Sequence, residues 1–264
     1  MCVGVFDSGV GGLTVWRELQ RILGGRFIYF GDTAHVPYGD KNPEQLMEYF
    51  WEILEFFEKR EVKVVVVACN TMSAVVLPKV KDKVRIKLFG MIDAAVAETV
   101  EVSQGTVGVL ATKSTAASGA YERAFQAVRP TWEVRAQGCP QLVPFIESGL
   151  TDGPQLERAV REYVQPLIKA EVDTIVLGCT HYPFIRSVIQ RQVGPPITLI
   201  DPAVRIGRDV AAWLRSQNQL TEDAHSQTEF WVSRGPKGFQ TLARQFMGLE
   251  IPHVNLYEMA GEAE

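Results

Sequence analysis

The chain has 264 residues, of which 46% are hydrophobic and 22% are charged, and its formal net charge is −4. A chain of this length buries a full hydrophobic core, either in one large domain or in two modest ones. Because it has no dense Lys/Arg run, no apolar stretch of membrane-spanning length and no secretory signal pattern, we expect no nucleic-acid partner, no membrane span and a cytoplasmic location.

Short runs rich in Val, Ile and Phe alternate with stretches at helical spacing along the whole chain. We expect strands at residues 2–6, 27–30, 62–68, 86–89, 106–111, 132–135, 174–177, 197–200 and 229–232. This alternation predicts an α/β fold with mostly parallel strands that helices cover on both faces. The four consecutive valines at 64–67 are typical of a central strand.

Two segments of the first part of the chain are echoed in the second. "VKVVVVACNTMSAVV" at 62–76 is answered by "VDTIVLGCTHYPFIR" at 172–186, and "VGVFDSGVGG" at 3–12 by "VGVLATKSTA" at 107–116. Because the two separations are nearly equal, we expect two similar α/β lobes related by a pseudo-two-fold axis. The first lobe is expected to comprise residues 1–92 plus 206–264, and the second residues 93–205.

Cys69 and Cys179 occupy the same position in the first pair of echoed segments. Each follows a predicted buried strand and precedes a polar pair, so the lobe symmetry predicts that they face each other across one crevice. A helix N-terminus beside such a thiol lowers its pKa from about 8.5 towards neutrality, which makes it both a base and an acid. The alternative is a small buried hydrophobe. We interpret Cys2 and Cys139, which lack this context, as structural.

The motif "FDSGVGG" at 6–12 joins the first strand to a helix that is expected to begin near Leu13. Its backbone N–H groups are suited to a carboxylate or a phosphate. It lacks the full glycine spacing of a dinucleotide site, which is therefore the weaker interpretation. Asp7 is either the N-cap of this helix or a carboxylate that orients or deprotonates Cys69.

The motif "GDTAHVPYG" at 31–39 is too rich in turn formers to be helical. Tyr38 and Gly39 either close over a ligand or belong to a stiff surface turn around Pro37.

His181 lies two residues beyond Cys179, where it either tunes the thiol or plays a structural part. Glu147 ends a predicted helix, and a solvated carboxylate is its plainest interpretation. The four histidines have no metal-binding spacing, so no metal site is expected.

Six motifs, in this order, carry a resemblance that extends from residue 3 to about residue 248: "FDSGVGG", "GDTAHVPYG", "ACNTMSA", "LATKST", "CPQLVPFIESG" and "GCTHYPF". Together they resemble the cofactor-independent aspartate/glutamate racemase family. The cysteine pair alone would also fit the aspartate racemases. The motifs "FDSGVGG" and "GDTAHVPYG" favour the glutamate racemases.

The resemblance implies that Cys69 and Cys179 are the acid/base pair, with Asp7 assisting the first, and His181 and Glu147 the second. In the family the first cysteine serves the D-enantiomer and the second the L-enantiomer, without a cofactor. A homodimer that supplies D-glutamate for peptidoglycan is also implied. The substrate-binding residues that it implies are Asp7, Ser8, Tyr38, Gly39, Asn70, Thr71, Thr112, Thr115, Thr180 and His181.

Racemisation removes a proton from one face of a carbon and returns one to the other, so a thiolate and a thiol must flank that carbon. We expect the neutral donors of Ser8, Asn70, Thr71 and Thr180 to stabilise the developing charge. Three other functions remain open: a cysteine-nucleophile hydrolase or amidotransferase with His181 as base, a hinged binding module, and a redox pair.

Overall fold

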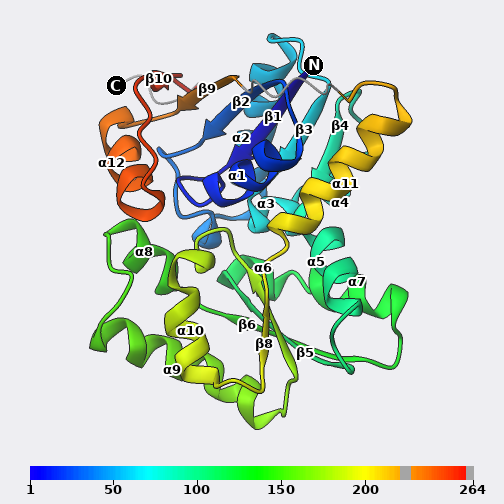
Figure 1. Cartoon of the computed structure of the whole chain (residues 1–264), viewed down its shortest axis with the longest axis vertical. Helices are drawn as coiled ribbons and strands as arrows, with labels where there is room; N and C mark the ends of the chain where they lie inside the picture. The colour runs from blue at the N-terminus through cyan, green and yellow to red at the C-terminus, as the bar shows by residue number, and fades with distance from the viewer. Residues whose placement is uncertain (221–226, 260–264) are drawn as a thin grey trace.

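The computed structural model describes residues 1–220 and 227–259. They form two separate sheets in which every pair of neighbouring strands is parallel, and helices cover both faces of each sheet (Figure 1). The predicted α/β class with parallel, doubly covered strands is confirmed. Residues 221–226 and 260–264 of the expected first lobe lie outside the described residues.

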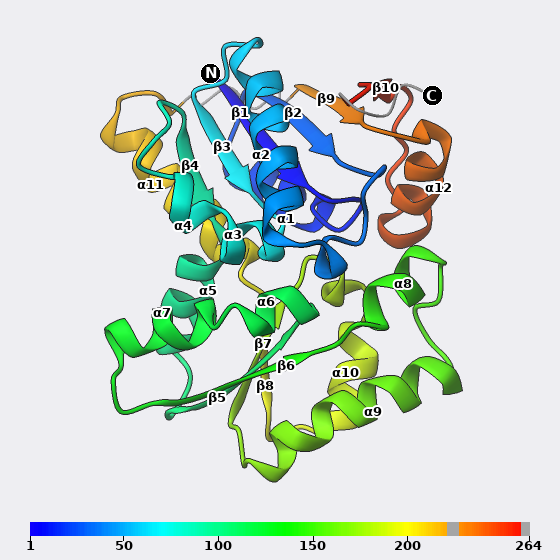
Figure 2. The ribbon, with the colours of Figure 1, turned by 180° about the vertical axis from the view of Figure 1, so that it is seen from behind.

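The first sheet has six strands. In spatial order they are β10 (Asn255–Leu256), β9 (Gln227–Val232), β2 (Arg26–Gly31), β1 (Cys2–Asp7), β3 (Val64–Val67) and β4 (Lys87–Gly90). One face packs against α1 (Leu13–Ile22), α11 (Ala203–Ser216) and α12 (Pro236–Met247). The opposite face packs against α2 (Pro43–Glu58), α3 (Asn70–Val75) and α4 (Leu77–Val80), which lie in front in Figure 2.

The second sheet has four strands, in the order β6 (Glu133–Gly138), β5 (Thr106–Ala111), β7 (Thr174–Gly178) and β8 (Thr198–Ile200). Helices α8 (Leu142–Glu147), α9 (Pro154–Lys169) and α10 (Arg186–Val193) cover one face. Helices α5 (Met91–Val100), α6 (Lys113–Ala117) and α7 (Ala120–Val128) cover the other. The short 3₁₀ helices η1 (Tyr38–Asp40) and η2 (Tyr182–Ile185) lie in loops that follow β2 and β7.

The order β6-β5-β7-β8 repeats the order β2-β1-β3-β4, which is the structural form of the echo in the sequence. Within the first sheet Phe6 lies opposite Val67, and within the second Ala111 lies opposite Gly178. Because parallel strands end at the same edge, the loops that follow β1, β3, β5 and β7 carry their polar residues towards the space between the two sheets.

The chain passes between the sheets at two helices. Met91 and Ala94 of α5 pack in the core of the first sheet, whereas Ala95 and Val96 pack in that of the second. The expected lobe boundaries at residues 92 and 206 fall within the first turns of α5 and α11. We propose these two helices as the connections between the lobes.

Strand bounds differ from the sequence expectations by a few residues. Strand β6 continues three residues beyond its predicted end to Gly138, and the two-residue strand β10 was not predicted because so short a segment shows no alternation. Among the described helices none is both long enough and apolar enough to cross a membrane.

Candidate active site

Cys69 and Cys179 line the same small cavity between the lobes. Cys69 lies two residues beyond β3 as the N-cap of α3, and Cys179 directly follows β7. They are 4% and 6% exposed. The cavity measures about 10 Å³, roughly the space of one water molecule. Its lining residues are Ser8, Pro37, Tyr38, Gly39, Cys69, Asn70, Thr71, Thr112, Val143, Cys179, Thr180 and His181.

The thiol of Cys69 is held in its neutral form. Burial raises its pKa, the negative charge of Asp7 raises it further, and the backbone N–H groups of Met72 and Thr71 lower it by less. The prediction that the helix N-terminus brings this pKa towards neutrality is therefore wrong for the closed structure. Helix α3 has only six residues, and the loss of hydration outweighs its favourable amides. Cys69 is accordingly suited to donate a proton.

A different environment surrounds Cys179. Its sulfur lies 3.8 Å from Nδ1 of His181, and Nε2 of the same ring lies 2.6 Å from Oε1 of Glu147. Burial lowers the pKa of His181, but the hydrogen bonds to Cys179 and Glu147 and the nearby negative charge outweigh it and raise this pKa well above its ordinary value. These contacts link Cys179 to Glu147 through the two nitrogens of one imidazole ring. Glu147 is thus paired with His181 and is not a solvated carboxylate.

Asp7 is fully buried at the end of β1. Its Oδ1 accepts a hydrogen bond from the backbone N–H of Gly9 at 3.0 Å, and its Oδ2 accepts one from the hydroxyl of Thr180, in the other lobe, at 3.0 Å. The N-cap of α1 is Gly12, which excludes the N-cap interpretation of Asp7. Burial raises the pKa of Asp7, although the charge of His181 opposes this.

Three threonine hydroxyls close a triangle across the lobe boundary. The Oγ1 atoms of Thr71 and Thr112 lie 2.8 Å apart, Thr112 donates to Thr115 at 2.9 Å, and Thr115 donates to Thr71 at 3.2 Å. Thr112 also caps α6, because its hydroxyl accepts the backbone N–H of Thr115. The triangle fixes the position of Thr71 beside the cavity when the lobes are closed.

Tyr38 is only 2% exposed, which excludes the surface-turn interpretation of its loop. Its hydroxyl donates to the carboxylate of Asp32, which also accepts the hydroxyl of Ser233 at 2.6 Å. The Tyr38 hydroxyl therefore faces Asp32, while the residue lines the cavity together with Gly39. Ser114 of the second lobe donates to the carbonyl oxygen of Gly39 at 2.6 Å.

Glycines allow the loops of the two lobes to approach closely. A Cβ atom on Gly11 would lie 2.5 Å from Oγ1 of Thr180 and 2.7 Å from Nδ1 of His181. One on Gly39 would lie 2.8 Å from Cβ of Thr112. Contacts this short are not tolerated, so side chains at these glycines would hold the lobes apart.

Three residues that the sequence reasoning did not single out support the site. Asp32 and Ser233 directly follow β2 and β9, so their position after predicted strands was an available signal. Tyr121, at 0% exposure, donates to Oδ1 of Asn70 at 2.7 Å. As one aromatic residue in an amphipathic helix, it carries no sequence signal of this contact.

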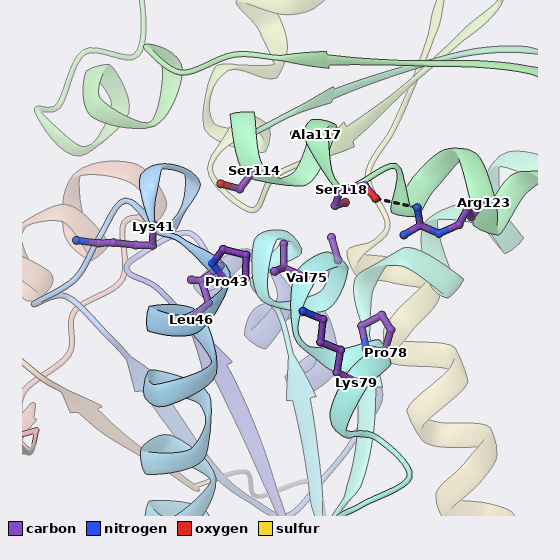
Figure 3. A pocket seen from close by; sticks show the side chains of 11 residues that line it. Lys41, Pro43, Leu46, Val75, Pro78, Lys79, Ser114, Ala117, Ser118 and Arg123 are labelled. Atoms are coloured by element: carbon purple, nitrogen blue, oxygen red, sulfur yellow. Dashed lines mark hydrogen bonds between the residues drawn. The ribbon is translucent and has the colours of Figure 1, made fainter.

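A second and larger cavity, of about 460 Å³, also lies between the lobes (Figure 3). Lys79 of α4 and Arg123 of α7 approach it from opposite lobes, whereas Lys41 extends away from the other labelled side chains. Neither Cys69 nor Cys179 lines it. Across residues 1–220 and 227–259, no group of three or more His, Cys, Asp and Glu side chains is placed to hold a metal ion.

Residues 12–206 match the family described as Asp/Glu/Hydantoin racemase. The chain belongs to this family. It is 44% identical to the glutamate racemase of Desulforudis audaxviator over 94% of both chains, and 40% identical to that of Geobacter metallireducens over 99% of this chain and 97% of the relative.

Solved structures of family members have the same fold. A glutamate racemase of Bacillus anthracis superposes with a TM-score of 0.94 at 31% identity, covering 98% of this chain and 97% of the other. The glutamate racemase of Francisella tularensis, in complex with D-glutamate, superposes with a TM-score of 0.90 at 32% identity and covers 97% of both chains.

Proposed function

We propose that this protein interconverts L-glutamate and D-glutamate without a cofactor, with Cys69 and Cys179 as its two proton-transfer groups. The observation that carries the proposal is the pair of cysteines, one from each lobe, on a single cavity. Full-length relatives that are glutamate racemases give the substrate class. A hydrolase with Cys179 as nucleophile would leave Cys69 without a role.

The two cysteines have different environments, and we assign them opposite proton-transfer roles. With L-glutamate bound, the thiolate of Cys179 takes the α-proton to its sulfur, and the thiol of Cys69 gives its proton to the opposite face of the carbon. His181 and Glu147 stabilise the starting thiolate. Asp7 assists Cys69, and the substrate ammonium group lowers the cost of negative charge on the buried sulfurs. The reverse sequence converts D-glutamate.

Neutral groups stabilise the developing negative charge in this proposal. The cavity lining includes Ser8, Asn70, Thr71 and Thr180, and preorganised donors in a dry site are worth on the order of a few kcal/mol each. Asn70 and Thr71 accept hydrogen bonds from the second lobe, and the Thr180 hydroxyl is oriented by the bond that it donates to Asp7 of the first lobe. Tyr38, Gly39, Thr112 and Thr115 complete the substrate-binding set that we propose.

Glutamate is the favoured substrate over aspartate. An aspartate racemase of Picrophilus torridus superposes with a TM-score of 0.55 at 18% identity, a likeness that concerns the fold alone. By contrast, the glutamate racemase of Escherichia coli, solved with L-glutamate and the activator UDP-MurNAc-ala, superposes with a TM-score of 0.77 at 25% identity.

The direct test incubates the purified protein with L-glutamate or L-aspartate in heavy water, without added cofactor. The expected result is D-glutamate with one deuterium at the α-carbon, and little change in L-aspartate. Proton NMR and chiral chromatography measure the two quantities. Inversion without deuterium, or α-proton exchange with L-aspartate alone, would contradict the proposal.

We further propose a cytoplasmic homodimer that supplies D-glutamate for peptidoglycan. The family resemblance supports this role. Growth of a D-glutamate-requiring bacterial strain, rescued by this gene and not by its Cys69→Ser variant, tests the supply of D-glutamate. Light scattering on the purified protein tests the dimer, with twice the 29.4 kDa mass of the chain as the expected result.

A further inference from the structure

Tyr121 connects the second lobe to the residue that follows Cys69. It is fully buried on α7, and its hydroxyl donates to Oδ1 of Asn70 at 2.7 Å. Asn70 is the first residue of α3, in the first lobe, and it lines the cavity that both cysteines share. The bond therefore joins the two lobes beside this cavity.

The other end of the Asn70 amide is left unpaired. Its Nδ2 is buried and has no hydrogen-bond partner among the residues that the structure describes, and the residue is 3% exposed. An unmatched buried donor costs free energy, so its persistence beside a cavity indicates a partner that arrives from outside. Because Asn70 lines the same cavity as both cysteines, that partner is a group of a ligand in this cavity.

The Tyr121 hydroxyl determines which end of the amide faces the cavity. Tyr121 donates its hydroxyl proton to the amide oxygen at 2.7 Å, and burial raises the pKa of Tyr121, so this proton stays on the phenol oxygen. A rotated amide would present its oxygen to the cavity, where it would repel a carboxylate. With the oxygen held by Tyr121, the Nδ2 donor is the end that remains for a ligand.

We infer that Tyr121 is a positioning residue that holds the Asn70 amide with its N–H donors towards a carboxylate of glutamate, and does so only in the closed state. This inference rests on the proposed function. It makes closure part of substrate recognition, because a donor of the first lobe is oriented by a hydroxyl of the second.

The test is a double-mutant cycle with Tyr121→Phe and Asn70→Ala. Phenylalanine keeps the buried ring and removes only the hydroxyl, and we expect kcat/KM for glutamate to fall about 10- to 100-fold, as for a lost hydrogen bond to a charged group. If Tyr121 acts through Asn70, Tyr121→Phe causes no further loss in the Asn70→Ala background. Equal losses in the two backgrounds would overturn the inference.

Tyr163→Phe is the matched control. It removes a hydroxyl from α9 of the same lobe, where the hydroxyl donates to Oε1 of Gln141 at 3.2 Å, away from the cavity lining. We expect its kcat/KM to remain within twofold of the wild-type value. If kcat/KM fell equally in Tyr163→Phe and Tyr121→Phe, the loss would follow from removing any tyrosine hydroxyl of this lobe. That result would contradict the positioning role.

Asn70→Asp tests the same orientation without changing Tyr121. The hydroxyl would hold one carboxylate oxygen and leave the other, an acceptor, in place of Nδ2. We expect glutamate binding to be weaker than in Asn70→Ala, and binding as tight as in the wild type would overturn the inference. Calorimetric titration with D-glutamate in a Cys69→Ser background, in which racemisation is lost, measures binding without turnover. A protein with both cysteines that binds glutamate but does not racemise it would refute the proposed function alone.

Discussion

Asp7 carries a carboxylate with no exposed surface, an arrangement that costs stability at neutral pH. Because its folded pKa is raised, the cost is absent below the unfolded pKa of about 3.9, grows as the pH rises and is complete above the folded pKa. Such a residue is retained for its chemistry rather than for the stability of the fold.

Asp7→Asn should therefore stabilise the protein while it lowers activity. We expect the unfolding temperature at pH 8 to rise by roughly 2–4 °C, the equivalent of about 1 kcal/mol for a chain of this size, and the gain to disappear below about pH 4. Differential scanning calorimetry across this pH range measures it. A variant that is less stable at pH 8 and fully active would refute this account of Asp7.

His181 has the opposite linkage. Its raised folded pKa means that protonation stabilises the fold fully below the unfolded pKa of about 6.5, and that this contribution is lost as the pH rises through the folded value. The bond to Glu147, at 2.6 Å, contributes to the shift.

Replacing Glu147 by Gln should thus destabilise the protein most at low pH. We expect a loss of about 1.5–3 kcal/mol below pH 6.5, as for a hydrogen bond to a charged group, and a smaller loss in the alkaline range. Urea unfolding at several pH values provides the measurement. A loss that grows with rising pH would show that His181 is neutral in the folded protein.

At the scale of elements, the loop at 8–12 that joins β1 to α1 sets how closely the lobes approach. Gly11→Ala places a methyl group 2.5 Å from Oγ1 of Thr180, so the lobes cannot close fully. We expect kcat/KM to fall about 100-fold, the effect of a misplacement of about 1 Å. Gly238→Ala in α12, where a Cβ atom has no neighbour within 4 Å, is the control and should keep full activity.

The strands and the two candidate catalytic thiols could be predicted from the sequence because each has a local sequence pattern. The valines at 64–67 and the repeated context of Cys69 and Cys179 need no knowledge of the lobe packing. Contacts between distant segments could not be predicted in this way. Asp32 accepts a hydrogen bond from Ser233, which lies 201 residues later in the chain. No sequence pattern near either residue predicts this contact.

The predicted pKa of Cys69 was wrong for a related reason. A helix N-terminus is visible in the sequence, whereas the degree of burial depends on how the second lobe closes over the first. Between the two lobes, loss of hydration is the largest influence on the pKa of the Cys69 thiol.

At the scale of the whole molecule, the two lobes enclose the cavity together. A cavity of about 10 Å³ does not admit glutamate, so the substrate enters only when the lobes move apart and is then held by both. Hydrogen bonds between Asp7 and Thr180, and between Thr71 and Thr112, join the two lobes beside this cavity.

Glutamate should consequently stabilise both lobes together. At a concentration of 100 times Kd, the gain is about 2.7 kcal/mol, which corresponds to a rise of roughly 5–10 °C in the unfolding temperature. We expect a single calorimetric transition, and a smaller rise for Gly11→Ala. Two transitions, only one of which responds to glutamate, would indicate binding to a single lobe.

The central claim is that the two sulfurs serve opposite faces of one carbon, and Cys69→Ser and Cys179→Ser in heavy water test it most directly. Each variant should lose racemisation by at least about 100-fold. Exchange of the α-proton without inversion should survive for one enantiomer at most, D-glutamate when Cys69 is intact and L-glutamate when Cys179 is intact. Full racemase activity in either variant would contradict the account.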